Sequence, residues 1–168
     1  GAQLNLYWAE FQIPVWRMQG RGWKLWDALS EMFAADGVLD AYDVIFIDTP
    51  PALGYLTING LAAADILLVP MGASFLEFDS TGRFFDMLGT TFGSIEESEN
   101  LAARALGRAE LAFEWDAVRT VITRYDGTQQ AELAGLMQAY LGPTLSPHRQ
   151  DFTALIGQAG EQVQGIYE

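Results

Sequence analysis

The chain has 168 residues, the length of one domain, and its 50% hydrophobic and 12% aromatic residues are enough to form a buried core. Its 22 acidic residues outnumber 9 basic ones and give a net charge of −13. The chain therefore lacks the excess of positive charge that is typical of nucleic-acid-binding domains. The absence of cysteine excludes disulfides, thiolate metal sites and a cysteine nucleophile, and a single histidine excludes a multi-histidine metal site. No apolar run approaches the ~20 residues of a membrane helix, and no secretory signal is recognisable, so we expect a cytoplasmic protein.

The N-terminal segment is rich in aromatic side chains and changes its hydrophobic period near Trp23. Loose alternation over residues 4–8, followed by Pro14, predicts a short strand and then a loop. From Trp23 onward, apolar residues recur at the spacing of one helix face, which predicts an amphipathic helix of about three turns that Gly37 ends. The residues of that face are Leu25, Ala28, Leu29 and Met32.

Three segments are predicted to form strands, and the first two are apolar runs of the kind that is buried on both faces. They are residues 44–47, residues 66–69, which Pro70 ends, and residues 119–123. Helices are predicted between and after them, at residues 54–64, at residues 79–92, and from the turn at Asp126-Gly127 to the stop at Gly142-Pro143. This alternation predicts an α/β fold, in which a parallel β-sheet with right-handed crossovers is flanked by helices.

The remaining segments carry weaker patterns. Residues 93–100 contain Glu96, Glu97 and Glu99 and are predicted to form a solvated loop, and residues 101–110 a short helix. A short extended piece is predicted near Leu145, and a last helix at residues 152–159.

The end of the first apolar run carries the candidate catalytic and metal-binding residues. An acid at the tip of a parallel strand typically holds a nucleotide-bound magnesium ion, directly or through water, which makes Asp48 the candidate ligand. Thr49, Pro50 and Pro51 follow it, and the two prolines stiffen a segment that is suited to sensing a γ-phosphate. In the alternative interpretation, Asp48 caps the next helix and the prolines only turn the chain.

The same region resembles a known family. Residues 42–70 read YDVIFIDTPPALGYLTINGLAAADILLVP, which resembles the Walker B strand, the switch segment and the next strand of the ParA/MinD family of P-loop ATPases. Residues 113–126 are similar to the strand that borders the adenine pocket in these proteins, and residues 148–168 to their adenine-side loop and the approach to their final helix. The resemblance is strongest to the plasmid-partition ParA and RepA proteins. The resemblance implies that Asp48, Thr49, Pro50 and Pro51 form the Walker B and switch segment, and that Thr123, Arg124, Pro147 and His148 lie beside the adenine. For Arg124 a surface ion pair with Asp126, and for His148 no special role, are the open alternatives.

One family motif is missing from the chain. The sequence contains neither KGGxxK nor GxxxxGK followed by Ser or Thr, and its only lysine, Lys24, has neither Ser nor Thr after it. A phosphate cradle needs open backbone N–H groups, a lysine and a hydroxyl group. We therefore expect residues 1–168 to be a single domain with a partial P-loop NTPase fold, the C-terminal part of a ParA-type ATPase domain that lacks Walker A.

The resemblance implies a fragment of an ATP-dependent plasmid or chromosome partition ATPase. ATP and magnesium are then the cofactors of the parent, and neither is expected to bind tightly to this chain, which should be inactive alone. A ParB-type partner, nonspecific DNA and an ATP-dependent dimer are implied for the parent, and a membrane is not. The alternative is a nucleotide-independent regulatory or protein-interaction module with a ParA-like fold. A Rossmann-type domain is disfavoured because no GxGxxG follows a predicted strand.

Overall fold

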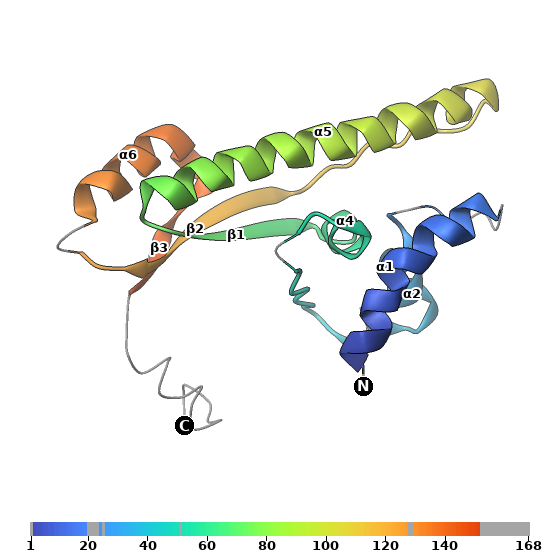
Figure 1. Ribbon diagram of the computed structural model, residues 1–168, viewed down its shortest axis with the longest axis horizontal. Helices are drawn as coiled ribbons and strands as arrows, with labels where there is room; N and C mark the ends of the chain where they lie inside the picture. Colours follow the sequence, from blue (N-terminus) through green and yellow to red (C-terminus); the bar gives the residue numbers. More distant parts are fainter. Residues whose placement is uncertain (1, 20–23, 25, 51, 128–129, 152–168) are drawn as a thin grey trace. The chain divides into compact units, whose positions relative to one another are not determined.

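Helices form most of the first part of the chain, and a parallel sheet follows them (Figure 1). The computed structural model describes residues 2–19, 24, 26–50, 52–127 and 130–151. The chain divides into two compact units. The first comprises Gly1–Asp65 and Ala112–Trp115, and the second Ile66–Leu111 and Asp116–Glu168.

The described part of the first unit contains the helices α1 (Ala2–Met18), α2 (Ala28–Ala35), α3 (Val38–Ala41) and α4 (Tyr55–Ala62). The prediction of a strand at residues 4–8 is wrong, because α1 includes them. Five residues are too few to distinguish a period of 2 from a period of 3.6. The predicted stop at Gly37 is confirmed, since this glycine has a φ of +68° directly after α2 and its cap residue. Helix α4 matches the helix predicted at residues 54–64.

The predicted strand at residues 44–47 does not form. These residues form neither helix nor strand and pair with no strand in the described part of the chain, and Val44 and Phe46 are 68% and 89% exposed. A strand is stabilised by neighbours on its hydrogen-bonding edges, which local sequence does not specify. The core of this unit lies elsewhere, around Ile13, Trp26 and Ile58.

The second unit is built on a three-stranded sheet in the order β1-β2-β3, with both neighbouring pairs parallel. The strands are β1 (Ile66–Gly72), β2 (Ala117–Tyr125) and β3 (Leu145–Asp151). Strand β1 continues through Pro70, where the sequence predicted its end, because an edge strand tolerates a residue without an N–H group. The parallel α/β architecture predicted from the alternation of elements is confirmed.

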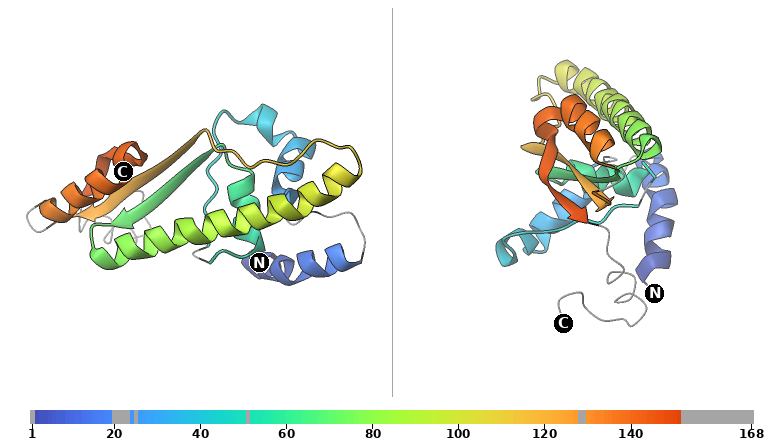
Figure 2. Two further views of the ribbon diagram at one scale, coloured as in Figure 1. Left: turned by 90° about the horizontal axis from the view of Figure 1, so that it is seen from above. Right: turned by 90° about the vertical axis from the view of Figure 1, so that its left-hand side faces the viewer.

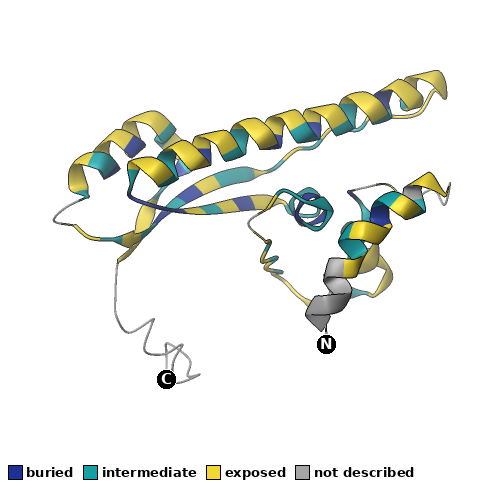
Figure 3. Ribbon diagram, in the orientation of Figure 1, coloured by how far each residue is buried: buried dark blue, intermediate teal, exposed yellow. Residues whose placement is uncertain are grey.

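Two helices cover one face of this sheet: α5 (Phe75–Ala105) and α6 (Ala131–Leu141), as Figures 1 and 2 show. The core lies between them and the strands, and comprises Met71, Ala73, Ile122, Ala134, Met137 and Leu145. Buried and exposed residues alternate along much of β1 (Figure 3). Ile66 and Leu68 point to the other face and are 59% and 60% exposed.

Helix α5 is longer than the predicted helix at residues 79–92. It includes Glu96, Glu97 and Glu99, so the prediction of a loop there is wrong. Glutamate is a good helix former, and a solvated helix face accommodates its charge. The helix ends before Gly107, whose φ is +61°. Helix α6 ends at the predicted Gly142-Pro143, in a short 3₁₀ turn (Gly142–Thr144). The helix predicted at residues 152–159 lies outside the described residues.

Candidate functional site

The candidate site residues fall into two groups. Asp48, Thr49 and Pro50 belong to the first unit, whereas Thr123, Arg124, Pro147 and His148 belong to the second. Pro51 lies outside the described residues.

The segment after Asp48 is attached to helix α4. The hydroxyl of Thr57, a residue only 4% exposed, donates a hydrogen bond to the carbonyl oxygen of Ala52 at 2.6 Å. The same hydroxyl lies 3.4 Å from the carbonyl oxygen of Pro50. The side chains of Ile47 and Thr49 pack where a Cβ on Gly60 would stand, with methyl carbons 3.2 and 3.0 Å from that position. The glycine therefore permits close contact between the extended segment and α4.

Asp48 itself is exposed, and the start of α4 is capped by another acid. The carboxylate of Glu10 accepts hydrogen bonds from the backbone N–H groups of Tyr55 at 2.6 Å and Leu56 at 3.0 Å. A carboxylate at this position satisfies unpaired donors and interacts favourably with the helix dipole. Glu10 thus occupies the capping role considered for Asp48, and the exposed Asp48 side chain is accessible to a ligand.

In the second unit, Arg124 lies at the end of β2. Its Nη2 donates to Oε1 of Glu77 at 2.6 Å, and the two residues form an ion pair. The neighbouring Thr123 pairs with Gly72 at the end of β1. The carboxyl ends of β1 and β2 therefore lie next to one another.

Pro147 and His148 lie in an irregular stretch of β3. Thr120 pairs with Leu145 and Ile122 with Arg149, so three residues of β3 stand opposite one residue of β2. A proline cannot donate to a strand ladder, which accounts for a bulge at this place. Both side chains are exposed, so the structure places the four predicted adenine-side residues on two adjacent strands, with Pro147 and His148 near the middle of β2.

Sequence reasoning missed several residues near the carboxyl ends of the strands. Glu77 contacts Arg124 across 47 positions of the chain, and Arg149 stacks over the ring of Tyr125 at 4.7 Å. The Ser74-x-x-Glu77 spacing is a helix-capping signature that marks Glu77 as part of a first helical turn, but it does not reveal the distant arginine.

The described residues contain no group of three or more His, Asp or Glu side chains that is arranged to hold a metal ion. Magnesium in nucleotide sites is commonly held by one or two carboxylates together with phosphates and water, and an exposed single carboxylate such as Asp48 fits this ligand set. Within the described part of the chain, we find no helix that is long and apolar enough to cross a membrane.

Comparison with known proteins identifies a family profile and relatives. The profile described as "AAA domain" matches residues 17–100. A "Putative replication protein A" from Sinorhizobium fredii is 36% identical over 137 residues, which cover 80% of this chain and 31% of that protein. The "Chromosome partitioning protein ParA" of Myxococcus xanthus is 39% identical over 72 residues, 43% of this chain and 23% of that protein. The chain thus spans about a third of these relatives or less.

A solved structure titled "Partition Protein" superimposes with a TM-score of 0.59 at 21% identity. The match covers 96% of this chain and 45% of that one. At this level of identity the likeness establishes the fold alone, a parallel α/β fold shared with that partition protein.

Proposed function

Because this chain belongs to the AAA domain family, among its ParA-like members, we propose that it is part of an ATP-dependent ATPase that partitions plasmids or chromosomes. The family itself is shown by the profile match over residues 17–100. The activity of the whole protein and the roles of individual residues go beyond family membership and are part of the proposal.

One observation supports the proposal most strongly: an exposed acid is followed by a segment tied to a buried hydroxyl. Asp48 ends an apolar extended stretch, and Thr57 binds the main chain at Ala52. In the proposed function, Asp48 is the Walker B acid and holds magnesium through water, while Thr49, Pro50 and Pro51 form the switch segment. Magnesium, when bound, neutralises phosphate charge, and the contribution of the chain's own residues is to orient and position the nucleotide and its metal ion.

The second unit would contact the base. Thr123 and Arg124 at the end of β2, and Pro147 and His148 on β3, are the proposed adenine-side residues. A guanidinium group stacks favourably on a purine ring, which is the role proposed for Arg124.

This sequence has no Walker A motif, so in the proposed function the phosphate cradle is supplied by residues outside it. We propose that these 168 residues are the C-terminal part of the ATPase domain and are inactive alone. In the parent protein, an ATP-dependent dimer, a ParB-type partner and nonspecific DNA complete the function, in the cytoplasm. The missing motif also favours a second candidate, a nucleotide-independent interaction module with the same fold.

The two candidates are separated by ATP hydrolysis in the protein encoded by the complete gene. We expect magnesium-dependent turnover, and Asp48→Ala should abolish most of it. Since Asp48 is exposed, the same substitution should change the free energy of unfolding by no more than about 1–2 kcal/mol. Turnover of the variant within a few-fold of wild type would contradict the magnesium role, and no ATP binding by the wild type would favour the interaction module.

A further inference from the structure

A single carboxylate ties together the ends of two parallel strands. Oε2 of Glu77, in the first turn of α5, accepts a hydrogen bond from the backbone N–H of Gly72, the last residue of β1. Oε1 of the same carboxylate accepts from Nη2 of Arg124 at 2.6 Å, near the end of β2. In parallel sheets, ligands bind outside these carboxyl ends.

The local structure holds this carboxylate in place. Ser74 caps α5, with its Oγ accepting from the backbone N–H of Glu77 at 3.2 Å, and this bond fixes the first turn of the helix. A Cβ on Gly72 would stand 2.5–2.8 Å from the carboxylate atoms, so the glycine provides the space that Glu77 occupies. Gly72 pairs with Thr123, the neighbour of Arg124, so Glu77 spans one strand pair.

The backbone of Arg124 is unusual. Its φ is +52°, and no other non-glycine residue among those described has a positive φ. Such a conformation is maintained by surrounding contacts and occurs preferentially at ligand sites. The side chains of Arg124 and Glu77 are 67% and 38% exposed, and exposed ion pairs contribute little to folding stability. Stability alone therefore does not account for the arrangement.

We propose that Glu77 is a positioning residue that holds the Arg124 guanidinium ready for the base of a purine nucleotide. This inference rests on the proposed function, in which Arg124 faces the adenine. An arginine that is already fixed in place loses less conformational freedom when a ligand binds. Glu77 acts through Arg124 and does not itself touch the nucleotide.

The test is a titration of the complete gene product with a fluorescent ATP analogue and magnesium. We expect Glu77→Ala and Arg124→Ala each to weaken binding about five- to tenfold, and the double variant to bind no more weakly than Arg124→Ala. Turnover at saturating ATP should stay within about twofold of wild type for Glu77→Ala, because the base contact affects binding rather than phosphoryl transfer. Asp79→Ala is the matched control, since it removes an α5 carboxylate that pairs with Arg83 instead. It should leave the affinity unchanged.

Glu77→Gln separates positioning from a structural role. A glutamine still accepts the bond from Gly72 but loses the charge that pairs with Arg124, so it should weaken binding as alanine does. This variant also carries the test if Glu77→Ala fails to fold. Wild-type affinity in Glu77→Gln, or additive losses in the double variant, would overturn the inference while the proposed function stands. An absence of ATP binding by the wild type would overturn both.

Discussion

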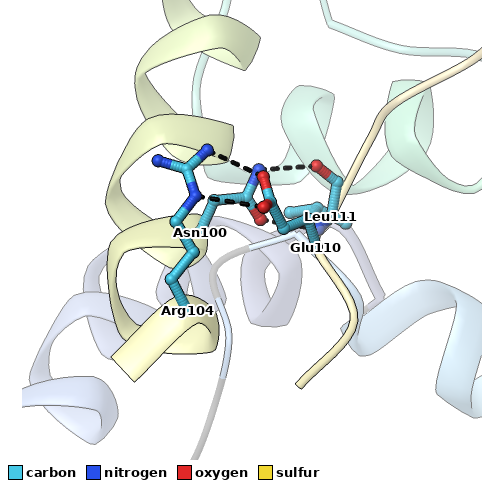
Figure 4. A network of polar contacts seen from close by, with 4 residues as sticks. All are labelled: Asn100, Arg104, Glu110 and Leu111. Atoms are coloured by element: carbon cyan, nitrogen blue, oxygen red, sulfur yellow. Dashed lines mark hydrogen bonds and ion pairs between the residues drawn. The ribbon is translucent and has the colours of Figure 1, made fainter. Parts of the chain in front are cut away.

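The side-chain amide of Asn100 pairs with the main chain of Leu111 as a neighbouring strand would (Figure 4). Its Nδ2 donates to the carbonyl oxygen of Leu111 at 2.9 Å, and its Oδ1 accepts from the backbone N–H of the same residue at 2.6 Å. One turn further along α5, Arg104 forms two hydrogen bonds to the carboxylate of Glu110, at 3.0 and 2.7 Å. These contacts fasten the returning chain to the end of the long helix.

Replacing Asn100 with alanine should destabilise the chain. The substitution leaves both polar main-chain groups of Leu111 without their side-chain partner, and Asn100 is only 8% exposed. We expect the free energy of unfolding to fall by about 1–3 kcal/mol. Urea denaturation measures it, with Ser98→Ala on the exposed side of the same helix as the control. Equal effects of the two substitutions would show that the pairing with Leu111 contributes nothing.

The Arg104–Glu110 pair predicts a pH dependence. The hydrogen bond from Arg104, aided by its charge and opposed by desolvation, lowers the pKa of Glu110 from its ordinary value of 4.5. A lowered folded-state pKa means that the pair stabilises the chain above the unfolded-state pKa, and that this stabilisation is lost as the pH falls through the folded-state value. Arg104 stays charged throughout, because the same hydrogen bond raises its pKa.

Glu110→Gln should therefore lower the Tm slightly near neutral pH, and the difference from wild type should shrink between about pH 5 and pH 3. The effect is small because the pair is exposed, and salt should reduce it. Thermal melts at several pH values measure it. A Tm difference that is constant down to the lowest pH would contradict the lowered pKa of Glu110.

Two glycines in neighbouring elements should respond in opposite directions to alanine. At Gly72 a Cβ would collide with the Glu77 carboxylate, so Gly72→Ala should displace the carboxylate and cost about 1–3 kcal/mol. At Gly89, inside α5, no atom lies within 4 Å of the new Cβ, so Gly89→Ala should stabilise the helix by about 0.5–1 kcal/mol. Chemical denaturation of both variants provides the comparison. A stabilising Gly72→Ala would show that Glu77 moves aside without cost.

The elements that sequence predicts well here are those with a strong local pattern. The strands predicted at residues 66–69 and 119–123 lie within β1 and β2, and the amphipathic spacing followed by Gly142-Pro143 matches α6. These signals are local, because the hydrophobic periodicity and the residues that end a helix are both found within a short stretch of sequence.

The features that the sequence did not predict depend on residues far apart in the chain. Residues 44–47 have the composition of a buried strand, yet none of the described residues pairs with them as a strand, so composition alone does not make this segment a strand. Glu10 caps α4 from 45 positions away and Glu77 reaches Arg124 across 47, and single-sequence patterns carry no such information. Asp48 was identified by its position after an apolar run and by the family resemblance, and its role stays a prediction.

The chain alone should not bind duplex DNA at physiological salt. Its net charge of −13 opposes phosphate contacts, which need a clustered basic face. Fluorescence anisotropy with a labelled duplex measures the affinity, and the complete gene product with ATP is the comparison. A micromolar, salt-sensitive complex of the chain alone would show that a local basic patch outweighs the net charge.

Calorimetric titration with magnesium and ATP tests the central claim most directly, namely that these residues are the Walker B and adenine-side part of a ParA-like ATPase. The complete gene product should bind ATP in a magnesium-dependent manner, and Asp48→Ala should weaken that dependence. The 168-residue chain should show at best weak affinity, because it lacks the phosphate cradle. Micromolar, magnesium-dependent binding by the chain alone, or no binding by the complete product, would contradict the account.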